Sequence, residues 1–225
     1  MMRTSLGLLL LAAACGGSDA YAPNIDPAHF VSGVNNPYFP LVPGTVFTYM
    51  TVETGELDTV TVTSDTIELM GVTCMVVHDV ATDAGVVHED TLDYYAQDDQ
   101  GTLWYMGEDT TEIDGTMTST EGSWRAGIDG AQPGMIIEGT PHVGDTYRQE
   151  FLAGEAEDQG EVVALDASIT VPAGSFTGCM LTRDFTALEP DVEEAKLYCP
   201  GTGNVEAHTT KGGAETEQLI SVTGP

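Results

Sequence analysis

Two histidines and two carboxylates lie close enough in the sequence to form a metal site. His78 precedes the turn sequence 82–85, and His88, Glu89 and Asp90 follow it. A hairpin at this turn would bring the four side chains together. Imidazole nitrogens and carboxylate oxygens bind divalent metals, so these residues are a candidate metal site. The alternative is a polar surface position, because the run that starts at His88 lacks the second histidine of a zinc-protease helix.

Acidic turns elsewhere are candidates for calcium. The chain has 36 Asp and Glu residues against 6 Lys and Arg residues, a formal net charge of −30 at pH 7. The turns at 97–101 and 155–160 offer the oxygen ligands that calcium prefers, but not the alternating ligand spacing of a helix-loop-helix calcium site. Asp and Gly also supply the backbone angles of hairpin turns. We therefore expect no cofactor, with calcium in such a turn as the alternative.

The glycine-rich segment 121–134 combines an aromatic and a basic residue, Trp124 and Arg125. Loops held by a rigid β scaffold are frequent ligand-contact sites. The pair is therefore a candidate ligand-binding site. In the alternative interpretation, Trp124 closes one end of the hydrophobic core and Arg125 pairs with a nearby carboxylate.

The sequence contains none of the common catalytic motifs. It has no nucleophile elbow, no phosphate-binding glycine loop and no dinucleotide fingerprint. Two carboxylates can hydrolyse a glycosidic bond, but such a pair is defined by a separation in space that a sequence does not give. We favour a protein without catalytic activity, and a secreted hydrolase that uses carboxylates is the alternative.

Three cysteines remain besides Cys15, which we expect to carry a lipid, and two of the three are expected to pair. A hairpin centred on Glu189 places Cys179 opposite Cys199, with Leu181 opposite Leu197 on the same face. A disulfide between Cys179 and Cys199 is therefore predicted for an oxidising compartment. Cys74 is expected to remain a buried free thiol.

The N-terminus has the features of a bacterial lipoprotein signal peptide. Arg3 gives a short positive region, and the apolar run 6–14 is too short to span a bilayer. Three alanines lead into Cys15, which we expect to carry the lipid after residues 1–14 are removed. The lipid would anchor the protein to the outer membrane or the cell surface, on the periplasmic or extracellular face. An ordinary secretory signal that releases a free protein is the alternative.

The charge of the mature chain restricts its partners. Removal of residues 1–14 leaves 36 acidic and 5 basic side chains, a net charge of −31. This charge repels phosphate backbones, and five basic residues are too few to neutralise them. Nucleic-acid binding is therefore excluded.

The elements that carry these residues form an internal repeat. Residues 43–107 resemble residues 143–209 in order and spacing, at an offset of about 100 to 105 residues. Cys74 and Cys179 occupy equivalent positions, and Arg183 takes the place of His78. The sequence therefore predicts two copies of one supersecondary unit.

Each copy has the pattern of antiparallel strands. Short runs rich in Val, Thr, Tyr and Ile are separated by Gly, Pro and Asp about every 8 to 12 residues. We predict an all-β fold in which the two units form one curved sheet, half-barrel or sandwich. Residues 15–35 are expected to be the lipidated cysteine and a tether, and residues 36–225 a single domain. Two separate lobes are the alternative, which strand-like runs within 108–141 disfavour.

Three segments carry a resemblance to known proteins. They are Asn-Pro-Tyr-Phe-Pro-Leu at 36–41 followed by Pro-Gly-Thr at 43–45, Glu-Asp-Thr-Leu-Asp-Tyr-Tyr-Ala-Gln-Asp at 89–98, and Gly-Ser-Trp-Arg-Ala-Gly at 122–127. With these segments the chain resembles a group of uncharacterised bacterial secreted lipoproteins over most of its length after residue 35. The resemblance implies export, but it implies no activity and no catalytic residues.

These expectations combine into one functional prediction. The chain is expected to be a non-catalytic, lipid-anchored β-protein of the cell envelope that binds or presents a ligand or a partner. The membrane is contacted through the lipid, and the other partner is an apolar ligand or a protein. A secreted hydrolase and a calcium-stabilised structural protein are the alternatives.

Overall fold

Antiparallel strands make up nearly all of the regular structure, which we describe from a computed structural model for residues 21–225. The predicted signal peptide and Cys15 lie outside these described residues. Within them, no helix is long and apolar enough to cross a membrane. The elements are η1 (Pro27–His29), β1 (Phe30–Val31), β2 (Val34–Asn36), β3 (Phe39–Leu41), β4 (Val46–Thr51), β5 (Leu57–Leu69), β6 (Val72–Asp83), β7 (Val86–Asp98), β8 (Leu103–Asp114), β9 (Met117–Ser119), β10 (Trp124–Arg125), β11 (Gln132–Ile137), β12 (Thr146–Arg148), β13 (Glu150–Phe151), β14 (Asp158–Val171), β15 (Gly174–Thr186), β16 (Glu193–Cys199), β17 (Gly203–Lys211) and β18 (Thr216–Thr223).

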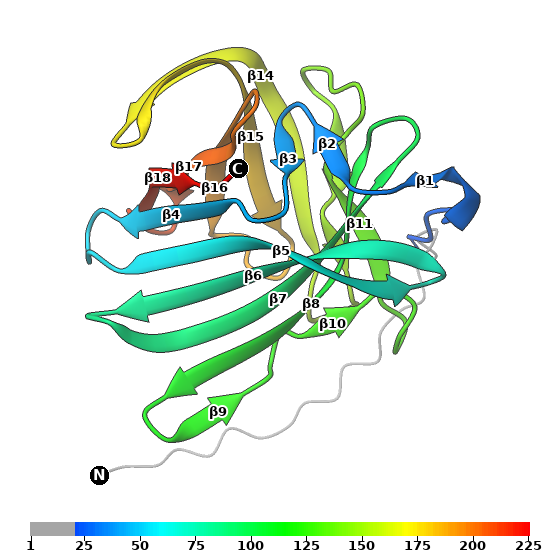
Figure 1. Ribbon diagram of the computed structural model, residues 1–225, viewed down its shortest axis with the longest axis horizontal. Coiled ribbons are helices and arrows are strands. Elements are labelled where there is room, and N and C mark those ends of the chain that lie inside the picture. The colour runs from blue at the N-terminus through cyan, green and yellow to red at the C-terminus, as the bar shows by residue number, and fades with distance from the viewer. Residues whose placement is uncertain (1–20) are drawn as a thin grey trace.

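One large sheet runs through both halves of the chain. Its strand order is β12-β14-β15-β16-β17-β18-β4-β5-β6-β7-β8-β11-β13, and the pairing of β18 with β4 joins the halves. The sheet curves back on itself, with β4 to β8 on one side and β14 to β17 on the other (Figure 1). The predicted all-β fold with one curved sheet is therefore confirmed.

Matching hydrogen bonds support the predicted repeat. The N–H of Gly44 donates to the carbonyl of Val62, and the N–H of Gly144 donates to the carbonyl of Val162, both at 2.8 Å. The two glycines have nearly the same positive φ, 91° and 94°. The strands that follow also pair in the same register, β4 with β5 and β12 with β14. Each copy therefore starts with the same glycine turn into a strand pair.

The two edges of the sheet meet through consecutive residues. β12 pairs with β14 at one edge and β13 pairs with β11 at the other, and only Gln149 separates β12 from β13. A Cβ atom on Gly134 would lie 2.2 Å from the Gln149 carbonyl carbon. The two edges of the sheet can approach each other here because Gly134 has no side chain.

Two hydrophobic clusters cover the two faces of the sheet. Within the sheet, successive side chains point to opposite faces, so Val77 of β6 belongs to the inner cluster and Val76 to the outer one. The inner cluster draws on both repeats, including Val62 and Val162, which are 0% exposed. The outer cluster lies under the segment 124–131. The two copies therefore share one inner core.

The segment that leads into the fold packs on the edge strand β13. The Tyr21 hydroxyl donates to the Pro133 carbonyl at 2.9 Å, and its ring meets Phe151 edge to face at 5.7 Å between centroids. The Arg148 guanidinium lies over both rings, 4.8 Å from the Phe151 centroid and 5.6 Å from the Tyr21 centroid. Tyr21 is thus fixed to the domain.

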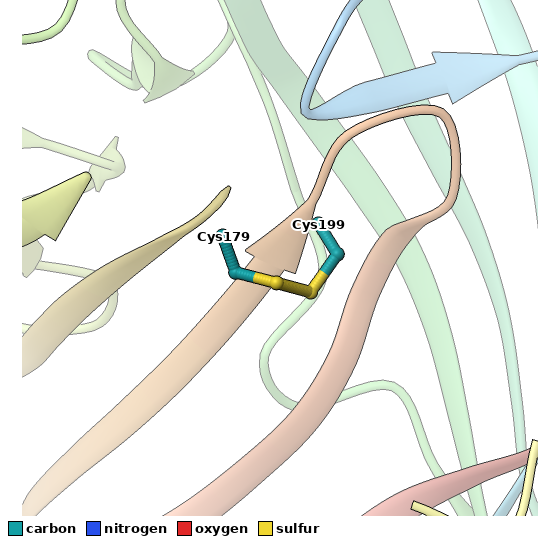
Figure 2. The surroundings of a disulfide bond; sticks show 2 residues. All are labelled: Cys179 and Cys199. Atoms are coloured by element: carbon teal, nitrogen blue, oxygen red, sulfur yellow. A yellow bond between two sulfur atoms is a disulfide. The ribbon is translucent and has the colours of Figure 1, made fainter. Parts of the chain in front are cut away.

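Cys179 and Cys199 form a disulfide between β15 and β16 (Figure 2). Met180 pairs with Tyr198 and Leu181 with Leu197, the register expected for a hairpin centred on Glu189. Cys74, at the equivalent place in the first copy, is a buried free thiol. The strand register of the second copy brings Cys179 opposite Cys199. In the first copy the residue opposite Cys74 is Ala96, so Cys74 has no cysteine to pair with.

Candidate functional site

The interior of the curved sheet contains a cavity of about 450 Å³. It reaches the surface at Asp158 and Glu215, which are exposed residues of its wall. The β2–β3 hairpin contributes Phe39, Pro40 and Leu41 to the opposite side. Strands of both repeats contribute the remaining walls, so the cavity is a property of the whole fold.

Strand alternation decides which side chains enter the cavity. Every second residue of a wall strand points inward, and along each strand the inward residues change from apolar to acidic. Glu217 pairs with Thr51 and Asp58 with Ala81, which places the acidic ends beside the turns that follow β4 and β6. The change occurs on five strands, from Val60 to Asp58, from Val77 to Asp79, from Tyr95 to Asp93, from Tyr198 to Glu194 and from Leu219 to Glu217.

Three carboxyl groups of the wall have pKa values well above those of ordinary carboxyl groups. Burial raises the pKa of Asp93 to about 7, although a hydrogen bond from the Tyr105 hydroxyl at 2.6 Å opposes the rise. Burial also raises the pKa of Glu150 to about 8 and that of Glu217 to about 7, and neighbouring carboxylates add to both shifts. The cavity therefore carries partly neutralised carboxyl groups near neutral pH.

Asp58 and Asp79 form a carboxyl pair on the adjacent strands β5 and β6. Burial raises the pKa of Asp79 far above its usual range, and its hydrogen bond with Asp58 and the charges of Asp58, Asp93 and Glu217 raise it further. Two carboxyl groups at hydrogen-bond distance share a proton more readily than they ionise together. This pair therefore shares a proton.

Lys196 is the one basic side chain of the wall, and it is already paired. Its ammonium lies 3.1 Å from an Asp184 carboxylate oxygen and 3.8 Å from one of Glu194. Burial alone would lower the pKa of Lys196, but the charges of Asp184 and Glu194 raise it above its usual value. The Gln149 amide also donates to Asp184, at 3.1 Å. Lys196 therefore stays charged. Because its charge is already paired with Asp184 and Glu194, it does not neutralise the other carboxylates of the wall.

Aromatic rings form the floor of the cavity. Phe39 lies between two tyrosines, 5.5 Å from Tyr95 and 6.0 Å from Tyr198 between ring centroids. Tyr105 stacks on Tyr95 at 5.0 Å. The faces of such rings attract cations and also pack against hydrocarbon.

The predicted metal residues do not converge. His78 contacts Asp90 at 3.0 Å, whereas His88 contacts Glu56 at 2.5 Å and Glu89 accepts a hydrogen bond from Thr91. Among residues 21–225, no three His, Cys, Asp or Glu side chains are grouped so that they could hold a metal. Of the four residues only His78 and Asp90 contact each other, and the turn between the strands does not gather all four into one site.

The predicted ligand contacts Trp124 and Arg125 do not line the cavity. Trp124 is 4% exposed, packs edge to face on Tyr105, and donates from its indole nitrogen to Glu150 at 3.1 Å. Arg125 forms a two-point ion pair with Asp109. These contacts are the ones described by the alternative interpretation, in which Trp124 closes the core and Arg125 pairs with a carboxylate. Trp124 supports two residues of the cavity wall from behind.

The acidic turns use their carboxylates to bind backbone N–H groups. Asp98 accepts hydrogen bonds from the N–H groups of Gln100 and Thr102, at 3.0 and 2.8 Å, and Glu157 accepts one from that of Gly154 at 2.9 Å. Carboxylates engaged in this way stabilise turns. These contacts correspond to the hairpin interpretation of both turns.

The residues that line the cavity were not predicted from the sequence. Its acidic wall comes from residues scattered over seven strands and the turn before β18, each unremarkable in a chain with 36 acidic residues. One signal was available, because Asp58 and Asp79 occupy the same alternation phase as the apolar residues Val60 and Val77. A carboxylate in the inward phase of a strand marks a buried charge, which needs a functional or structural explanation.

Comparison with known proteins identifies the fold only. No protein-family model and no curated protein matches the sequence. A predicted exported protein with a YmcC-like fold from Bacteroides fragilis has a similar structure, with a TM-score of 0.50 and 15% identity, covering 82% of this chain and 98% of that chain. A predicted lipoprotein from Parabacteroides distasonis gives a TM-score of 0.46 and 11% identity, covering 84% and 99%. The first likeness shows that the chain has a YmcC-like fold.

Proposed function

We propose that this protein is an exported, lipid-anchored component of the cell envelope that binds a small ligand inside its curved sheet. The observation that carries the proposal is the cavity of about 450 Å³, which both repeats build and which the β2–β3 hairpin closes at one side. Ligand pockets in proteins typically have this size and combine apolar walls with a few polar groups. The signal peptide pattern and the exported fold neighbour support the location.

A binding role agrees with how the polar groups of the wall are arranged. The wall offers carboxyl groups and tyrosines but, within residues 21–225, no serine or cysteine among its lining side chains. Cys74 is buried in the outer cluster, and burial raises its pKa to about 12, so it is a poor nucleophile. The side chains of the cavity are therefore suited to hold a ligand.

Replacement of Cys15 tests the location. In a Gram-negative host that carries the full chain, the wild type is expected to sediment with membranes and to incorporate labelled palmitate. Cys15→Ala should lose the label, since the thiol is the site of lipid attachment. Cys74→Ala is the matched control and should keep it. Equal labelling of the Cys15→Ala variant and the wild type would contradict the lipid anchor.

A cavity-filling variant tests the binding role. Ala207 of β17 faces the cavity between Lys196 and Glu217 of the neighbouring strands. Ala207→Phe is expected to reduce the fraction of molecules that carry a non-covalent ligand at least tenfold, because the ring occupies the ligand volume. Native mass spectrometry of protein purified from membranes measures this fraction.

The control for this variant is Val163→Phe. Val163 is 43% exposed on β14, so the same ring is added outside the cavity. Its ligand occupancy should match that of the wild type. A wild-type protein that carries no adduct, or an Ala207→Phe variant that is as fully occupied as the control, would refute a ligand in this cavity.

A further inference from the structure

The charge of the cavity wall identifies the class of its occupant, an inference that rests on the ligand-binding function proposed above. Eight carboxyl side chains line the cavity, against the single ammonium of Lys196. Lys196 is held by Asp184 and Glu194 and so neutralises little of the rest. In an interior of low dielectric, unpaired carboxylates repel one another strongly. An anionic occupant is therefore excluded, and a cation is favoured.

Unpaired polar atoms in the wall point to a ligand independently of this charge. Tyr198 is only 4% exposed and lines the cavity, yet within residues 21–225 its hydroxyl makes no hydrogen bond. The wall residue Asn204 also has a buried Oδ1 atom that lacks a partner in the same part of the chain. Buried polar groups normally have partners. An unpaired acceptor and an unpaired hydroxyl around one cavity match an N–H donor supplied by an occupant.

The arrangement of the carboxyl groups favours an organic cation over a metal ion. A metal requires several oxygens within about 2.5 Å of one point, but no three carboxylates of residues 21–225 are grouped in this way. They are instead spread over both walls, with Asp58 and Glu217 on one side and Glu150 and Asp158 on the other. An extended molecule can reach both sides, whereas a single ion cannot.

We infer that the cavity binds an aliphatic amine. Its ammonium group meets the carboxylates of Asp58 and Glu217 and the hydroxyl of Tyr198, and its methylene groups lie on the rings of Phe39 and Tyr95. Ammonium groups form charge-assisted hydrogen bonds with carboxylates and are attracted to aromatic faces. The apolar ligand that the sequence predicts would fit the aromatic floor but would leave the carboxylates unpaired.

Amine binding should displace protons from the wall. The groups that face the site are the carboxyl groups of Asp58, Asp79, Asp93, Glu150, Asp158, Glu194, Glu215 and Glu217 and the ammonium of Lys196. A bound ammonium favours the charged form of the carboxyl groups, so protons leave as it enters. An aliphatic amine itself stays protonated, since its pKa is near 10.4. Affinity is therefore expected to rise about tenfold or more from pH 6 to pH 8.5.

Calorimetric titration with cadaverine tests the inference. The uncharged analogue 1,5-pentanediol has the same length, and Ca²⁺ supplies charge without a carbon chain. Cadaverine is expected to bind at least tenfold more tightly than either, with proton release visible as a dependence of the binding heat on the ionisation enthalpy of the buffer. Ala207→Phe should abolish the binding.

Two charge-matched double variants locate the site. Asp58→Asn with Glu217→Gln should weaken cadaverine binding about tenfold or more, because two charge-assisted hydrogen bonds are lost. Glu68→Gln with Glu121→Gln removes the same charge from exposed positions and should leave affinity unchanged. Equal weakening by both pairs would indicate attraction by overall charge and would overturn the assignment.

The remaining outcomes separate this inference from the proposed function. If 1,5-pentanediol binds as tightly as cadaverine and Ala207→Phe blocks it, the cavity is a binding site but not one for amines. If Ca²⁺ binds with higher affinity than cadaverine, the occupant is a metal and the amine is refuted. If none of the three probes binds and the wild type also carries no adduct from membranes, both proposals fail.

Discussion

Replacing Trp124 by alanine is expected to lower the free energy of unfolding by about 3–5 kcal/mol, the usual cost of removing a buried aromatic side chain. The indole is 4% exposed and packs against Tyr105 in the outer cluster. Its removal leaves a void, and the Glu150 carboxyl group loses the hydrogen bond that the indole nitrogen donates to it. Equilibrium unfolding in urea at pH 7 measures the change.

Trp124→Phe separates packing from hydrogen bonding. It keeps an aromatic ring but not the donor to Glu150, so the loss of stability should be clearly smaller than that of Trp124→Ala. Ile128→Ala lies in the same segment, but Ile128 is 50% exposed and the change should have little effect. An unfolding free energy of Trp124→Ala within 1 kcal/mol of the wild type would show that the 124–131 segment does not cover a core.

The melting temperature is expected to fall by at least about 5–10 °C between pH 5 and pH 8. Asp93, Glu150 and Glu217 have folded pKa values of about 7, 8 and 7, whereas carboxyl groups in an unfolded chain titrate near 4. The folded state therefore binds more protons between these values, and its stability declines as pH rises through this window. For Asp93 alone, two pH units correspond to about 3 kcal/mol, and a chain of this size loses about 2–4 °C for each kcal/mol.

Asp93→Asn should reduce this dependence on pH. The amide is uncharged throughout, and its oxygen can still accept the hydrogen bond from Tyr105. The variant is expected to melt higher than the wild type at pH 8 and near it at pH 5. Asp65→Asn, at an exposed position of β5, should follow the wild type. Asp109, whose pKa its hydrogen bond with Arg125 lowers, titrates below this window and does not interfere. A melting temperature that rises from pH 5 to pH 8 would contradict the assignment of protonated carboxyl groups to the cavity.

The fold was largely predictable because local patterns determine it. Alternation and turn residues located the strands, and the hairpin centred on Glu189 placed Cys179 opposite Cys199, since antiparallel register is fixed once the turn is known. The cavity was not predictable in the same way. Asp58, Asp79 and Glu217 meet only because β18 pairs with β4 and β4 with β5, and the pairing of strands so distant in sequence has no local signal.

Trp124 and Arg125 illustrate what residue type alone cannot show. Their types are common in binding sites, so composition favoured a ligand role. In the structure both have polar partners within the protein, Glu150 and Asp109. The hydroxyl of Tyr198, which lines the cavity, has no such partner within residues 21–225. Residue type does not show which polar groups remain unsatisfied.

The attachment of Tyr21 to β13 limits how far the domain can stand from a membrane. Tyr21 lies six positions after Cys15, and an extended chain spans at most about 3.5 Å per residue. With the lipid on Cys15, as we propose, the docked tyrosine would stay within about 20 Å of the bilayer surface, less than the thickness of the hydrocarbon core. A ligand bound in the cavity would then be exchanged beside the lipid headgroups and would not be carried across the periplasm.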